Sequence, residues 1–99
     1  MDNISKVSEI TSEDLADYLR LQDLTDDEVN TLDNLLLVAR EYVKQYTGRS
    51  DAEIDKYPDM IIAIFIMVQD MWDNRTLYVQ GTVNPVVDTI INLHQINLL

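Results

Sequence analysis

The side chains that could do chemistry in this sequence are few: one histidine and 18 carboxylates, with no cysteine. His94 lies in an apolar stretch, where a single histidine is more often structural than catalytic, and no Ser–His–Asp set can be assembled around it. The lack of cysteine excludes thiol nucleophiles and cysteine-ligated metal centres. We therefore expect a protein that is not an enzyme and binds no cofactor.

Two groups of carboxylates are spaced closely enough to consider a cation. Asp26, Asp27 and Glu28 fall where a helix is expected to begin, and Asp70 and Asp73 are about one helical turn apart. The first group suits a helix N-terminus, and the second suits a solvated helix face. Neither group has calcium-loop spacing, and the two glycines form no phosphate-binding loop. We expect no metal site.

Helices must position these side chains, because helix caps recur along the chain. Thr11 and Thr25 each precede an acid by three residues, which predicts helices over about 12–20 and 25–47. Gly48 follows the second helix, as a C-terminal cap glycine would.

Two prolines predict the later helices. Pro58 begins one that extends to about Asn74, and Asn84 with Pro85 begins a last one that extends to about His94. The sequence thus predicts one all-α domain over residues 1–99, a small four-helix domain. Its other segments are an N-terminal arm (1–10), a single helical turn (51–57) and an extended, β-like arm between the third and fourth helices (76–84).

The net charge of -11 excludes several kinds of partner. So acidic a surface repels nucleic acid and anionic lipid, which disfavours a DNA or RNA reader. The longest apolar run, Met60 to Val68, is far shorter than the ~20 residues that a membrane span needs. The polar N-terminus contains no signal peptide, so we expect a soluble protein without membrane contact.

The helix after Pro58 is apolar on more than one side. Its core face is predicted to comprise Met60, Ile61, Ile64, Phe65, Val68, Met71 and Trp72. Ile62, Ala63 and Ile66 share the opposite side with acids, which implies contact on two sides. Two explanations are open for that second side. The last helix or the N-terminal arm of the same chain could cover it, and the residues alone favour this explanation. The alternative is a neighbouring subunit.

The helix over 25–47 has a similar surplus of apolar residues. Its predicted stripe is Leu32, Leu35, Leu36, Ala39, Tyr42, Val43 and Tyr46. Leu37 and Val38 lie outside this stripe, which makes self-association a hypothesis to consider.

Four phrases occur in a specific order: ITSEDLADYLRL, then AREYVKQYTGR (Ala39–Arg49), then DMWDNR, and finally NPVVDTIINLH. From about Ile10 to His94, this order and spacing resembles the small head–tail connector (adaptor) proteins of tailed bacteriophages and prophages, also described as phage DNA-packaging proteins. The tail LHQINLL departs from the family, whose members often end in Arg or Tyr-Arg.

The resemblance implies a structural protein of the virion neck, present in the host cytoplasm before assembly. It implies a homo-oligomeric ring, a dodecamer, between the portal protein and a tail-side stopper, through which DNA passes without specific binding. The candidate contact residues for the ring or the portal are Leu37, Val38, Ile62 and Ile66 on the helices, Leu77, Tyr78 and Val79 in the arm, and Ile96, Leu98 and Leu99 in the tail.

An acidic phage or prophage regulator is the alternative function, from a different class. Such a protein would mimic DNA and bind a host DNA-binding protein through its carboxylates. A mimic should expose acids with few surplus apolar residues, whereas this chain has both. A small enzyme or metal-binding domain is disfavoured, because the sequence contains no catalytic set, phosphate-binding loop or calcium-loop spacing.

Overall fold

The computed structural model describes residues 4–74 and 84–96, and this part of the chain is all-α, as predicted, with no strand. Within these two ranges, a short 3₁₀ turn precedes five α-helices. The elements are η1 (Val7–Glu9), α1 (Ser12–Leu19), α2 (Asp26–Thr47), α3 (Asp51–Ile54), α4 (Asp59–Asn74) and α5 (Pro85–His94). The predicted extended arm over 76–84 lies outside the described residues except for Asn84, which caps α5.

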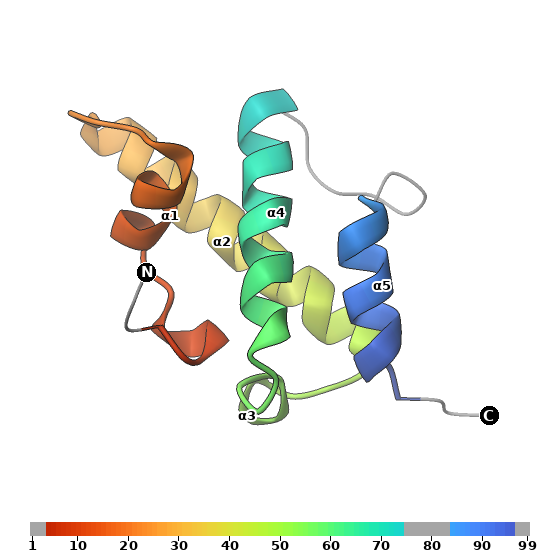
Figure 1. The fold of residues 1–99 in the computed structure, drawn as a ribbon. Coiled ribbons are helices and arrows are strands. Elements are labelled where there is room, and N and C mark those ends of the chain that lie inside the picture. Colours follow the sequence, from red (N-terminus) through yellow and green to blue (C-terminus); the bar gives the residue numbers. More distant parts are fainter. Residues whose placement is uncertain (1–3, 75–83, 97–99) are drawn as a thin grey trace.

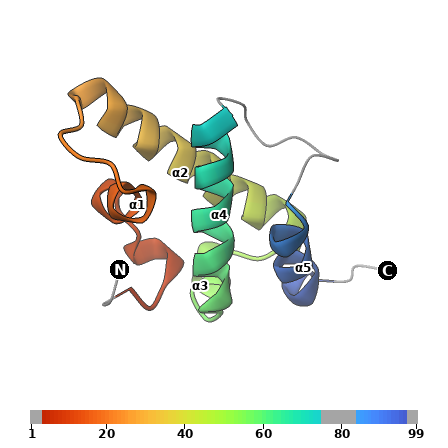
Figure 2. The same ribbon diagram turned by 45° about the horizontal axis from the view of Figure 1, so that its top comes forward.

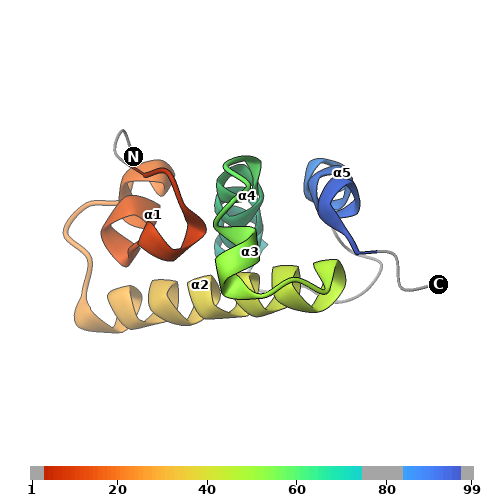
Figure 3. The same cartoon turned by 90° about the horizontal axis from the view of Figure 1, so that it is seen from below.

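The helices form two layers. The long helix α2 makes one layer, and α1, α4 and α5 lie in a row across the same side of it (Figure 3). In this row α4 is the middle helix, and the short α3 lies beside its first turn (Figures 1 and 2). The Cα atoms extend over 47 × 30 × 18 Å, so the domain is flat. A flat domain gives α4 neighbours on three sides.

Local side chains fix where the helices begin and end. The hydroxyls of Thr11 and Thr25 accept hydrogen bonds from the backbone N–H three residues later, at 3.3 and 3.2 Å. Ser50 caps α3 in the same way. Gly48 ends α2 with φ of 73°, in the left-handed region that glycine adopts without strain. The predicted caps are therefore confirmed.

The core fills the space between α2 and the row of helices. Leu15, Leu32, Met60 and Val87, from four different helices, are fully buried. The predicted stripes of α2 and α4 face this core: Tyr42, Tyr46, Ile61 and Trp72 are partly buried, and the other predicted members are buried.

The N-terminal segment is packed against the domain, which differs from the arm expected over 1–10. Val7 and Ile10 are 5% and 3% exposed, and the turn η1 between Lys6 and Ile10 holds both side chains inward. Arg40 of α2 fixes this turn, since its Nη2 donates hydrogen bonds to the carbonyl oxygens of Val7 at 3.0 Å and Ile10 at 3.1 Å.

Candidate functional site

Four large apolar side chains are exposed among the described residues: Leu37 (57%), Ile62 (54%), Val86 (51%) and Leu93 (71%). They come from three helices: α2, α4 and α5. Scattered single apolar residues are normal on a surface, but Leu93 and Val86 are seven residues apart and so share one face of α5. That face has no cover within the described part of the chain.

Of the candidate contact residues on the helices, the structure exposes two and covers two. Leu37 and Ile62 are exposed. Val38 and Ile66 are instead partly buried against the monomer core. Ala63, which shared the second side of α4 in the sequence pattern, is fully buried.

The coverage of α4 has a physical reason. Because α4 lies between α1 and α5 above α2, its buried arc is wider than that of a helix with one neighbour (Figure 3). Of the apolar residues on the second side of α4 that a neighbouring subunit could cover, only Ile62 is therefore exposed. The other explanation, coverage by the same chain, accounts for the full burial of Ala63 and the partial burial of Ile66.

The candidates toward the C-terminus mostly lie outside the described residues. This applies to Leu77, Tyr78, Val79, Leu98 and Leu99. Ile96 is described, and it is partly buried. Its N–H donates to the carbonyl of Thr47 at 2.8 Å, and its side chain approaches Gly48, so Ile96 holds the end of α5 against the end of α2.

The face formed by Val86 and Leu93 was missed by the sequence reasoning. The signal was present, since the two residues are apolar and repeat at i and i+7. The sequence alone gave no means of separating this stripe from Val87, Ile90 and Ile91, which the fold buries.

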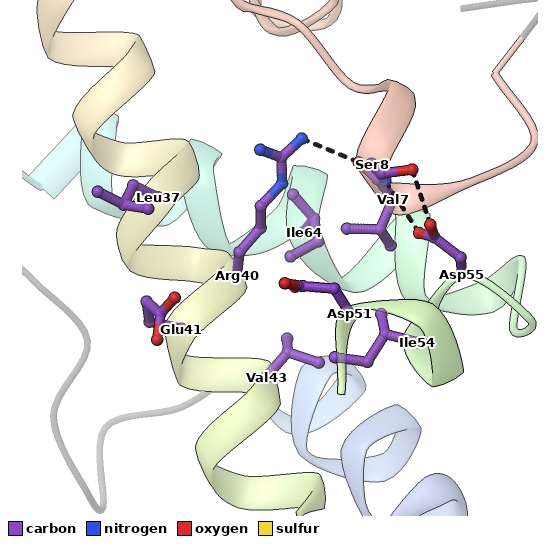
Figure 4. A pocket seen from close by; sticks show the side chains of 10 residues that line it. All are labelled: Val7, Ser8, Leu37, Arg40, Glu41, Val43, Asp51, Ile54, Asp55 and Ile64. Carbon is purple, nitrogen blue, oxygen red and sulfur yellow. Dashed lines mark hydrogen bonds between the residues drawn. The ribbon is translucent and has the colours of Figure 1, made fainter. Parts of the chain in front are cut away.

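A pocket of about 270 Å³ opens beside Leu37, between η1, α2, α3 and α4 (Figure 4). Buried apolar side chains make its floor, and polar side chains make its rim. The lining residues are Val7, Ser8, Leu37, Arg40, Glu41, Val43, Asp51, Ile54, Asp55 and Ile64. We call this cavity the Leu37 pocket. It joins segments that are up to 57 positions apart in the sequence.

The rim of the Leu37 pocket carries three carboxylates. Lys44 lies between two of them, with its Nζ 3.3 Å from Glu41 and 3.4 Å from Asp51. Hydrogen bonding to Glu41, and then to Asp51, raises the pKa of Lys44. Asp55 accepts hydrogen bonds from the N–H and hydroxyl of Ser8 at 3.0 and 2.7 Å, which ties α3 to η1.

Arg40 forms one wall of the pocket and points toward η1 (Figure 4). Within the described part of the chain it forms no ion pair, and its buried Nε has no hydrogen-bond acceptor. Its charge is met instead by the two carbonyl oxygens of the N-terminal turn. Arg40 is thus a structural link between α2 and η1.

His94 has a structural environment. Its Nε2 lies 2.8 and 2.9 Å from the two carboxylate oxygens of Asp59, and its ring stacks on Tyr57 with centroids 4.1 Å apart. Arg49 donates from Nε to the carbonyl of His94 and lies 5.0 Å from the Tyr57 ring centroid. The last turn of α5 is thereby attached to the first turn of α4.

This attachment can be measured by a double-mutant cycle. Asp59→Asn and His94→Ala should each lower the free energy of unfolding, and the pair should show a coupling of about 1 kcal/mol, because the two side chains bond to each other. Urea unfolding followed by circular dichroism measures all four proteins. Strictly additive effects would contradict the contact.

Neither a metal cluster nor a membrane-spanning helix is present in the described ranges. Residues 4–74 and 84–96 contain no group of three or more potential metal ligands, and none of their helices is long and apolar enough to cross a membrane. Asp26, Asp27 and Glu28 lie in the first turn of α2, the location expected for acids that favour a helix N-terminus.

Comparison with known proteins gives no neighbour. No protein-family model, curated protein or solved structure matches this chain.

Proposed function

We propose that this chain is a subunit of a phage head–tail connector, a ring that joins the portal of the DNA-filled head to a tail-side stopper protein. The motif order from Ile10 to His94 suggests this role by resemblance. The structural observation that carries it furthest is the exposure of Leu37, Ile62, Val86 and Leu93 on three different helices of a flat domain.

A ring subunit needs contacts in more than one direction. In a closed ring each copy uses two different patches for its two neighbours, and further surface meets the partners above and below. A single exposed patch would suit a two-fold dimer better. Apolar side chains on α2, α4 and α5 supply separate patches of the required kind.

The charge suits a passage for DNA. With 18 acidic residues against 7 basic ones, the chain repels phosphate groups, so a channel lined by such subunits offers the duplex no adhesive surface. The role therefore involves passage of DNA without base readout or catalysis.

An acidic regulator remains the second candidate, because the same net charge of -11 could present a DNA-like surface to a host protein. The exposed apolar side chains favour the connector over the regulator. A regulator that works through carboxylates has no use for Leu93, which is 71% exposed.

Deletion of the gene in the phage that encodes the chain distinguishes these two functions. A connector subunit is expected to leave DNA-filled heads and free tails that fail to join, visible by electron microscopy, and expression of the wild-type chain in trans should restore tailed particles. Normal yields of tailed, infectious particles after deletion would contradict the connector role, and would be expected for a regulator dispensable for assembly.

A further inference from the structure

The Leu37 pocket combines an apolar interior with an acidic rim. Val43, Ile54 and Ile64 of its floor are at most 2% exposed, and Leu37 projects beside them with 57% of its surface exposed. An apolar side chain from outside could therefore contact an apolar floor and the Leu37 side chain together. Removing apolar surface of both partners from water favours such a contact.

The charges around the pocket are predominantly negative. On α2, Leu37 lies between Asp33 and Glu41, which are four residues before and after it and so flank it on the same side of the helix. Across the opening, α3 contributes Asp51, and Asp55 follows directly after it. The side chains of Glu41 and Asp51 are 62% and 69% exposed, so both can meet a partner.

The two cations at the pocket are already engaged. Lys44 lies between Glu41 and Asp51, and Arg40 is directed at the carbonyl oxygens of η1. Of the charged residues that line the pocket, three are carboxylates (Glu41, Asp51 and Asp55) and one, Arg40, is a cation, so the lining is negative, which favours a positively charged occupant. A second copy of this chain, with a net charge of -11, is disfavoured as that occupant.

We propose that the Leu37 pocket docks a basic segment of another protein, in which one large apolar side chain is flanked by lysine or arginine. The apolar side chain enters the pocket, and the flanking cations approach Glu41 and Asp51. This inference shares Leu37 with the proposed connector role and assigns that side chain to a contact with a different protein instead of a second copy. Its test contains no portal, so it can fail separately from the connector role.

Peptide titration followed by ¹⁵N NMR tests the proposal. Three capped pentapeptides, identical except for a central Lys-Leu-Lys, Gln-Leu-Gln or Glu-Leu-Glu, serve as probes with the full chain. The Lys-Leu-Lys peptide should produce saturable shifts at the amides of Arg40, Glu41, Asp51 and Ile54, and the Glu-Leu-Glu peptide should produce none there. The affinity of the neutral peptide should be lower than that of the basic one by about threefold or more.

Two charge-matched variants separate the pocket from general attraction to an acidic protein. Glu41→Gln with Asp51→Asn should weaken the basic peptide about threefold or more, since exposed ion pairs have effects of this size. Glu13→Gln with Asp17→Asn, which makes the same charge change at exposed positions of α1, should leave affinity nearly unchanged.

Several results would overturn the proposal. They are equal binding of the basic and neutral peptides, equal loss in both variants, shifts spread over the acidic surface, and no saturable shift at millimolar peptide. Concentration-dependent shifts at the pocket amides without any peptide would also overturn it, because a second copy would then be the occupant.

Discussion

Replacing Phe65 with alanine is expected to lower the free energy of unfolding by about 3–5 kcal/mol. The Phe65 side chain is 2% exposed, and its ring lies 4.9 Å from that of Tyr18, centroid to centroid, so it joins α4 to α1. The substitution removes that contact and leaves a cavity that the helices fill only partly. A domain of this size has only about 5–15 kcal/mol in total. Urea unfolding monitored by circular dichroism measures the loss.

Ile62→Ala is the matched control on the same helix. Ile62 lies three residues earlier and is 54% exposed, so its truncation should cost less than about 1 kcal/mol. Similar losses for both variants would mean that the buried and exposed faces of α4 are wrongly assigned.

For the proposed connector subunit, Ile62→Asp and Leu93→Asp are expected to weaken assembly on the portal about tenfold or more, while the monomer stays folded. Both side chains are more than half exposed in the monomer, so an aspartate there remains in water. In an assembled ring it would be an unpaired, desolvated charge. Analytical ultracentrifugation with portal protein measures assembly, and circular dichroism measures the fold.

Two further variants act as controls. Asn92→Asp adds one charge on α5 without removing an apolar side chain and should assemble almost normally. Ile66→Asp should lower both stability and assembly, because Ile66 is partly buried against the core. If Ile62→Asp unfolds the domain, Ile62 is part of the monomer core and the expected interface on α4 is lost.

The helices could be predicted from the sequence because their signals are local. Thr11 and Thr25 bond to backbone within one turn of themselves, and Gly48 adopts its positive φ without reference to the rest of the fold. The first and last residues of α2 and α5 were therefore predictable to within a residue or two. The turn η1 was missed in part because Arg40, which bonds to it, lies 30 and 33 positions away. It also has a local cap, since Glu9 accepts hydrogen bonds from the N–H groups of Ser5 and Lys6.

Burial depends on which helices become neighbours, and the sequence pattern does not contain that information. Ala63 and Ile66 looked like surplus apolar residues on a helix with one neighbour, yet in the folded chain Ala63 is fully buried and Ile66 is partly buried against the core. For the same reason, the exposure of Val86 and Leu93 on one face of α5 could not be predicted from the sequence. The Leu37 pocket was also beyond sequence reasoning, since four separate elements must meet to form it.

Contact of the exposed apolar side chains with other molecules can be tested most directly by native mass spectrometry of the chain mixed with the portal protein from the same genome. Several copies should bind each portal, and the Ile62→Asp and Leu93→Asp chains should remain at the monomer mass. A wild-type chain that remains unbound with portal in excess would contradict the proposed contact of these side chains with other molecules. Variants that assemble as fully as the wild type would contradict it as well.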